Sequence, residues 1–146
     1  MSNEFIGSGI TFGFNSAGSP STYTTLAGIA SLEPPASIAD DLDASALDST
    51  AKEFVTGLAD PGECTMVVNL RKATTGSAPW VASQTAFEAY ANDGVLHGFK
   101  ITFPGSTTVV YSFSGFVKQF KISRLDPNAV ATADVVIKVS GAITKA

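Results

Sequence analysis

The densest group of residues that could bind a metal is the set Asp40, Asp41 and Asp43. Closely spaced carboxylates are typical of calcium loops. In an EF-hand counted from Asp41, however, the sixth position is Ala46 where the turn needs glycine, and the twelfth is Lys52 where a bidentate glutamate belongs. The pattern therefore favours an acidic segment that is solvated or paired at an interface, and it predicts no metal site.

His97 is the only histidine of the chain and Cys64 the only cysteine. A structural zinc site would need carboxylates for most of its ligands, which is rare. A hydrolase built around His97 is a second possibility, but the chain has no Gly-x-Ser-x-Gly elbow, and His97 shares the apolar face of its expected strand. We expect a core or interface histidine, no catalytic site and no cofactor.

The stretch around these aspartates, about residues 40–62, combines acidic and large apolar side chains. Between Asp40 and Glu63 there are seven acidic residues and a single basic one, Lys52. This stretch is therefore more negative than the whole chain, whose net charge is −4. Five large apolar residues are spaced through it: Leu42, Leu47, Phe54, Val55 and Leu58. An ordinary exposed loop rarely carries so many. Two interpretations follow: a long Ω-loop folded on its own domain, or a loop that packs on another copy of the protein.

The residue order from Leu42 to Glu63 is LDxSxLDSTAKEFVxGLxDPGE. This run resembles the signature of the tail tube (major tail) proteins of long, flexible-tailed bacteriophages, and the rest of the chain resembles them more weakly. The resemblance implies a small β-sandwich or barrel subunit with a fold shared with the type VI secretion tube protein. It also implies hexameric rings that stack into a tube through which DNA leaves the capsid.

In that family the loop that holds the signature lies at ring-to-ring and subunit-to-subunit contacts. The resemblance therefore implies an interface made by Leu42, Asp43, Leu47, Asp48, Thr50, Lys52, Glu53, Phe54, Val55 and Leu58. Apolar residues among them would act as anchors, and charged residues would fix the register. Further implied partners are the tape measure protein and the tail terminator. DNA would pass without specific binding, no membrane would be involved, and the protein would lie in the virion tail after assembly in the host cytoplasm.

The composition suits one domain over residues 1–146. Charged residues make up 15% of the chain, against roughly a quarter in typical soluble domains. Large subunit interfaces would explain this, and so would a monomer with a surface rich in Ser and Thr. A pI near 4.7 argues against a protein that binds the phosphates of nucleic acids. The lone cysteine excludes a disulfide within the chain, and we find no signal peptide or membrane span.

Alternating apolar residues predict the first strands. After a flexible N-terminal arm at residues 1–8, the runs Gly9–Phe14 and Thr22–Leu26 form an expected hairpin. Gly62–Arg71 is the cleanest strand of the first half, with even-numbered apolar residues on one face. A helix is then expected over about residues 79–92, capped by Ser77 and ended by Gly94.

Alternating apolar residues predict strands through the last third of the chain. One strand is expected from Val95 to Phe103, with His97 on its apolar face, and the last from Val135 to Ile143. Between them, the apolar residues occupy odd positions up to Phe113 and even positions from Phe116 onward. One inserted residue shifts the phase in this way, so we predict a β-bulge or bend near Ser114–Gly115.

The sequence thus predicts a mainly β fold: an antiparallel β-sandwich or open barrel of two sheets, with one α-helix at about 79–92 and a long loop at about 40–62. The expected function is a structural virion protein, a subunit of the tail tube. The alternative is a monomeric β-sandwich module that binds a ligand, of the carbohydrate or adhesion type. Such a module would show a groove lined by exposed aromatic residues such as Trp80 or Tyr90.

Overall fold

The computed structural model describes residues 9–15, 23–76, 79–105 and 108–145. The N-terminal arm expected at 1–8 and the helix cap expected at Ser77 lie outside these residues. The described residues form nine strands and one α-helix. In chain order these are β1 Thr11–Asn15, β2 Thr24–Thr25, β3 Ile29–Glu33, β4 Ile38–Asp43, β5 Phe54–Asp60, β6 Glu63–Asn69, α1 Ala82–Asp93, β7 His97–Phe103, β8 Val109–Arg124 and β9 Thr132–Lys145.

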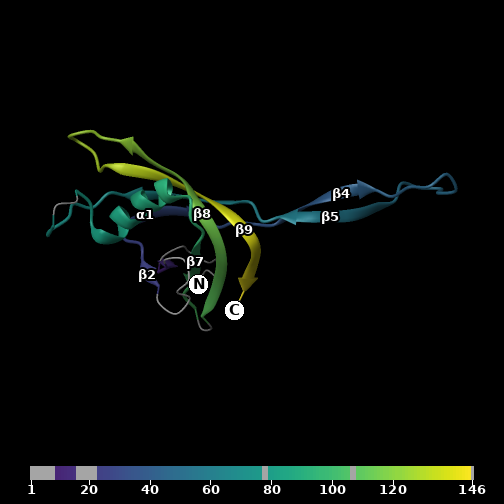
Figure 1. Cartoon of the computed structure of the whole chain (residues 1–146), viewed down its shortest axis with the longest axis horizontal. Helices are drawn as coiled ribbons and strands as arrows, with labels where there is room; N and C mark the ends of the chain where they lie inside the picture. The colour runs from purple at the N-terminus through teal and green to yellow at the C-terminus, as the bar shows by residue number, and fades with distance from the viewer. Residues whose placement is uncertain (1–8, 16–22, 77–78, 106–107, 146) are drawn as a thin grey trace, which may run out of the picture.

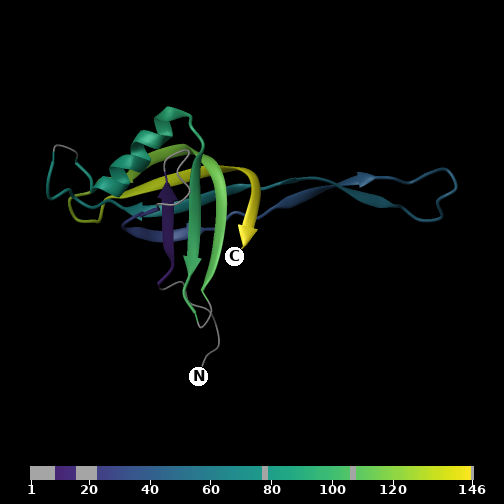
Figure 2. The same cartoon turned by 60° about the horizontal axis from the view of Figure 1, so that its bottom comes forward.

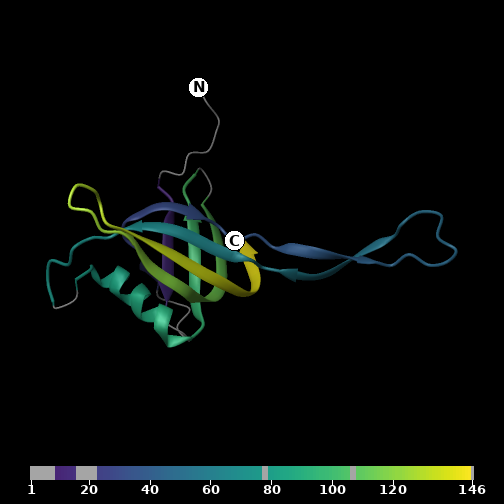
Figure 3. The ribbon, with the colours of Figure 1, turned by 90° about the horizontal axis from the view of Figure 1, so that it is seen from above.

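Seven of the strands form one antiparallel sheet in the order β2-β1-β7-β8-β9-β6-β3. This sheet curls into a half-barrel, and α1 lies along one side of it (Figures 1 and 2). Strands β4 and β5 form a separate two-stranded sheet that projects away from the half-barrel (Figure 3). The predicted fold class, a mainly β antiparallel sandwich or open barrel of two sheets with one helix, is confirmed, and the main sheet has the open-barrel form. We call everything outside residues 38–60 the body.

Aromatic side chains fill the core between the curled sheet and α1. Phe12 on β1, Phe87 on α1 and Phe99 on β7 are completely buried. The ring centroids of Phe12 and Phe99 lie 5.7 Å apart, and Phe14 meets Phe87 edge to face at 4.7 Å. Edge-to-face pairs of this kind add to the stabilisation from burial. Phe87 is thus the fully buried apolar contact of the helix with the sheet, and Ala86, Tyr90 and Ala91 pack beside it.

A buried polar side chain, Gln84, also fixes the position of the helix on the rest of the body. Gln84 is fully buried, and its Nε2 donates 2.9 Å hydrogen bonds to the carbonyls of Ala27 and Asn69. Its Oε1 accepts a hydrogen bond from the Arg71 amide at 2.9 Å. A buried amide with its hydrogen bonds made specifies one position of the helix. The helix begins at Ala82, later than expected, and ends as predicted at Gly94, whose φ of 65° is left-handed.

Several sequence predictions are confirmed in the body. Strands β1 and β2 pair as the expected hairpin. Every second residue is buried in β6, in β7 from His97 to Ile101, and in the first half of β9. Val95, which we placed on the same face as His97, is exposed because it precedes β7. Pro34 directly follows the end of β3, at a place where a residue without an amide hydrogen does not interrupt the sheet.

The long strand β8 has the predicted irregularity, but the change of face occurs further along. Its register with β9 shifts between Ser112 and Ser114, yet the extra residues there belong to β9, and β8 keeps its alternation up to Val117. The first extra residue on β8 is Lys118, and a second, Ser123, follows near the end of the strand. Lys118 moves Phe120 onto the face that packs against the core.

The predicted loop at 40–62 needs a correction. Most of it is a β-hairpin, in which β4 pairs antiparallel with β5, and only the connection at 44–53 is irregular. We name residues 38–60 the acidic hairpin. It contains Asp40, Asp41, Asp43, Asp48, Glu53 and Asp60 against the single Lys52, a formal charge of −5. Because the whole chain carries −4, the body is nearly neutral at +1.

Candidate assembly surface

The tip of the acidic hairpin is held by its own hydrogen bonds. Asp43 Oδ1 accepts from the Ser45 amide at 2.9 Å, and Ser45 Oγ accepts from the Glu53 amide at 2.8 Å. Ser49 Oγ accepts from the Ala46 amide at 2.9 Å. Short polar side chains that bond to nearby amides define turns in this way. The pKa of Asp43 is lowered, chiefly because its carboxylate accepts the Ser45 amide.

The base of the hairpin is fixed where it joins β6. Asp60 Oδ1 accepts a hydrogen bond from the Gly62 amide at 2.8 Å and another from Lys138 Nζ at 3.3 Å. The amide of Val139 donates to the Gly62 carbonyl at 3.2 Å. The pKa of Asp60 is lowered, first by the Gly62 amide and then by Lys138. The hairpin is thus anchored to β9 at its base, where it leaves the body.

Both faces of the acidic hairpin expose large apolar side chains. Leu42 lies opposite Val55, and Asp43 lies opposite Phe54. Directly opposed residues share a face and neighbouring residues alternate, so Val55 and Phe54 lie on different faces. Phe54 is 58% exposed, and Leu58 is 95% exposed. A lone two-stranded ribbon is marginally stable in water, and both faces of this one leave large apolar side chains exposed to solvent.

All ten predicted interface residues lie on this hairpin, and all ten are exposed. The structure therefore places Leu42, Asp43, Leu47, Asp48, Thr50, Lys52, Glu53, Phe54, Val55 and Leu58 on one projecting element. It also adds Ile38, which is 68% exposed on β4 and which the sequence analysis missed. Ile38 precedes the signature run, so only its apolar character next to Pro34–Pro35 could have indicated it.

The ligand-binding alternative predicts a groove lined by exposed aromatic residues such as Tyr90 or Trp80, and both of these side chains make contacts within the chain. Tyr90 packs edge to face against Phe14 at 5.7 Å and stacks on His97 at 3.7 Å between ring centroids. Trp80 Nε1 donates to Glu88 Oε2 at 2.9 Å. Tyr90 is thus engaged in the core, whereas Trp80 also lines an open cleft of about 600 Å³ with Thr74, Gly76 and Val81.

His97 has the surroundings of a core residue. Only 4% of it is exposed, and its Nε2 lies 3.0 Å from Asp93 Oδ2. The pKa of Asp93 is lowered, mainly by the hydrogen bond that it accepts from the Val95 amide, and to a smaller extent by His97. Among the described residues, the ring is hydrogen-bonded to Asp93 and stacked on Tyr90, and neither is the nucleophile that a Ser–His or Cys–His hydrolase needs.

Cys64 is fully buried on β6, and burial, with a smaller contribution from Glu33, raises its pKa to about 12. Within the described ranges, no group of three or more His, Cys, Asp and Glu side chains is close enough to hold a metal ion. None of the described helical residues forms a span of the length and apolarity needed to cross a membrane.

Solved structures share this fold. A tail protein of an empty gene transfer agent particle, refined helically with C6 symmetry, superposes with a TM-score of 0.71 at 16% identity, covering 97% of this chain and 98% of that one. A chain of the anti-feeding prophage baseplate, 6-fold symmetrised, gives 0.68 at 10% identity over 100% and 97%. The SPP1 tail tube gives 0.66 at 11% identity over 97% and 78%. At these identities the likeness establishes the fold alone.

The fold is therefore that of the subunits of phage tails and phage-like particles. No curated protein sequence matches the chain. Residues 6–146 match the family model described as lambda phage tail tube protein, so the chain belongs to the lambda phage tail tube protein family. It is a structural protein of the virion tail, as the signature at Leu42–Glu63 predicted.

Proposed function

We propose that copies of this protein close into hexameric rings, that the rings stack into the tail tube, and that the acidic hairpin joins one copy to the next. The observation that carries the proposal is the hairpin itself. It projects from the body and exposes apolar side chains on both faces (Figure 1). The six-fold symmetry of the gene transfer agent tail and of the anti-feeding prophage baseplate supports the hexamer.

Burial of the hairpin supplies the free energy of association in this account. Each large apolar side chain that passes from water to a packed interface contributes about 1.5–3 kcal/mol. Leu47, Phe54 and Leu58 are the anchors, and Asp48, Lys52 and Glu53 fix the register by charge. Thr50 and Asp43 lie at the tip and complete the contact.

The open edges of the main sheet support ring closure. The outer strands are β2, with two residues, and β3, with five. Exposed strand edges pair readily with another chain, and a closed ring removes them. Edge-to-edge pairing between neighbouring copies would therefore extend the half-barrel sheet around the ring.

The remaining partners follow from the place of the protein in a tail. We infer that the tube meets the tape measure protein and the tail terminator, and that the protein acts without catalysis. The body carries a formal charge of only +1, which provides no excess of basic groups to hold DNA. DNA therefore passes without specific binding.

Electron microscopy of the purified full-length chain over a range of concentrations tests the proposal. We expect stacked rings or tubes, with a sedimentable fraction that grows with concentration. A chain that sediments as a monomer at every concentration, and shows no ring on the grid, would contradict the proposal and favour the ligand-binding alternative.

A further inference from the structure

A second surface complements the acidic hairpin at the other end of the molecule. The acidic hairpin extends from one end of the body, and the connection between β8 and β9 extends from the opposite end (Figures 1 and 3). We name residues 118–134 the β8–β9 end. It exposes apolar side chains of its own, with Leu125 at 71% and Val130 at 61%.

The charge of the β8–β9 end is opposite to that of the acidic hairpin. It holds Lys118, Lys121 and Arg124 against Asp126 and Asp134, a formal charge of +1. Lys118 pairs with Glu63 at 2.9 Å. Lys121 lies opposite Asp134 in the register but makes no ion pair with any described residue, and neither does Arg124. Two exposed cations thus stand beside the exposed apolar side chains.

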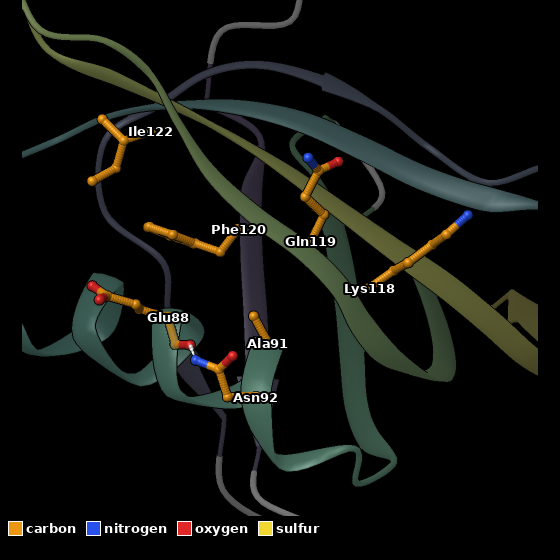
Figure 4. Close-up of a pocket in the computed structure, with 7 residues that line it drawn as sticks. All are labelled: Glu88, Ala91, Asn92, Lys118, Gln119, Phe120 and Ile122. Carbon is orange, nitrogen blue, oxygen red and sulfur yellow. Dashed lines mark hydrogen bonds between the residues drawn. The ribbon is translucent and has the colours of Figure 1, made fainter.

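A cleft runs beside this end, between β8 and α1. Strand β7 pairs with β8 only as far as Gly115, so beyond that residue β8 has no strand neighbour on the α1 side. The cleft there has a volume of about 360 Å³. Figure 4 shows Phe120 and Ile122 pointing from β8 toward the helix residues Glu88 and Ala91. The bulge at Lys118 is what turns these two side chains toward the helix.

The two surfaces match in chemistry and in position. One offers carboxylates among Leu and Phe side chains, and the other offers cations among Ile, Leu and Val side chains beside an open cleft. Surfaces at opposite ends of one molecule cannot meet within it, but they can meet head to tail between two copies. Such heterologous contacts generate closed rings or repeating stacks.

We propose that the acidic hairpin of one copy docks on the β8–β9 end of another copy, with its apolar side chains against Leu125, Val130 and the cleft, and its carboxylates facing Lys121 and Arg124. The proposal rests on the function proposed above, because it names the surface that receives the hairpin. It commits to a second copy of this chain as the occupant.

A charge-swap experiment on the full-length chain tests the docking surface. The variant Lys121→Glu/Arg124→Glu should raise the concentration needed for sedimentable assembly by about tenfold or more. Adding Asp48→Lys/Glu53→Lys to it should restore that concentration to within about threefold of the unsubstituted protein, because the charges are then exchanged. The control Lys100→Glu/Lys145→Glu makes the same change of charge outside both surfaces, at lysines that lie over the Tyr23 and Tyr111 rings. The hairpin substitutions should not restore any loss of assembly that this control shows.

The outcomes separate the two proposals. If Lys121→Glu/Arg124→Glu assembles like the unsubstituted protein, or the swap fails to rescue, while Phe54→Asp still blocks assembly, the β8–β9 end is not the receiving surface and the hairpin keeps its proposed role. If Phe54→Asp also assembles normally, the proposed role of the hairpin fails as well. Rescue by the swap alone, and not in the control, supports the docking.

Discussion

Lys138 Nζ donates a 3.3 Å hydrogen bond to Asp60 Oδ1, and this contact joins the core strand β9 to the base of the acidic hairpin. The same carboxylate accepts the Gly62 amide, and the Gly62 carbonyl accepts the Val139 amide. Three contacts at one corner thus set the direction in which the hairpin leaves the body. Assembly through a projecting element needs a defined direction, because a hairpin that points elsewhere cannot reach the proposed surface on the neighbouring copy.

Replacing Gly62 with alanine should strain this corner. Its φ of 80° is left-handed, and an added Cβ would lie 2.9 Å from the carbonyl oxygen of Ala36. We expect Gly62→Ala to lower the free energy of unfolding by about 1–2 kcal/mol, measured by urea denaturation. Thr56→Ala, at an exposed position of the same hairpin, should change it by less than about 0.5 kcal/mol. Equal stability of the two variants would contradict the strain.

Replacing Phe54 with aspartate should abolish assembly and leave the fold intact. Phe54 is 58% exposed, so the change removes little packing within the copy, but it would bury an unpaired charge in the interface. Sedimentation velocity should give a monomer with an unchanged circular dichroism spectrum. Val95→Asp, at an apolar residue that is 42% exposed outside both proposed surfaces, should assemble normally. Loss of assembly in both variants would remove the specific role of the hairpin.

Gly115 should resist substitution because two strands approach closely there. An added Cβ would lie 2.4 Å from the carbonyl oxygen of Lys138 on β9. We expect Gly115→Ala to cost about 1–3 kcal/mol of stability by forcing β8 and β9 apart. Ser114→Ala, at the exposed neighbouring position, should cost less than about 0.5 kcal/mol. Urea denaturation distinguishes the two, and a Gly115→Ala variant of unchanged midpoint would contradict the close approach.

Cys64 should not react while the protein is folded. Its side chain is fully buried, and its pKa is raised to about 12, mainly by burial. A thiol of that pKa is ionised to only about one part in ten thousand at pH 8, and the thiolate is the reactive form. A coloured disulfide reagent should label the protein in denaturant and not in buffer. Comparable labelling rates under both conditions would contradict the burial of the Cys64 side chain on β6.

The tip and base of the hairpin should loosen only in acid. The pKa values of Asp43 and Asp60 are lowered because each carboxylate accepts a backbone amide. A lowered pKa means that this stabilisation is complete above about pH 3.9, the ordinary value, and is lost as the pH falls through the lowered pKa. In NMR titrations, the Ser45 and Gly62 amide signals should move with midpoints below 3.9. Asp43→Asn should abolish the titration at Ser45 alone. Midpoints above 3.9 would contradict the hydrogen bonds.

The sequence predicted the body well wherever one strand face is buried. Apolar and polar residues alternate along β6, β7 and β9 because one face of each strand is buried. Strand β3 was missed because its register with β6 shifts between Ile29 and Ser31, which breaks the period of two. The phase change in β8 was detected but placed too early, because the extra residue that causes it, Lys118, gives no signal in hydropathy, and the second extra residue, Ser123, was not detected.

The ten residues predicted for the interface lie together on one hairpin, whose form was not predicted, and their role in an interface stays a prediction. Ten residues of the acidic hairpin were identified from the signature run and their apolar character, and all are exposed. The two strands that carry them were not foreseen, because aspartate-rich segments have low strand propensity and neither face is buried to impose an alternation. The β8–β9 end was not foreseen because its residues come together only after β8 and β9 pair.

The most direct test of the account is a cryo-electron microscopy map of the assembled protein, at a resolution that traces residues 38–60. The account predicts that Phe54 and Leu58 lie buried against a neighbouring copy, with the hairpin extended away from its own body. A map in which the hairpin folds back onto its own body, or projects freely into solvent in the assembled tube, would contradict it.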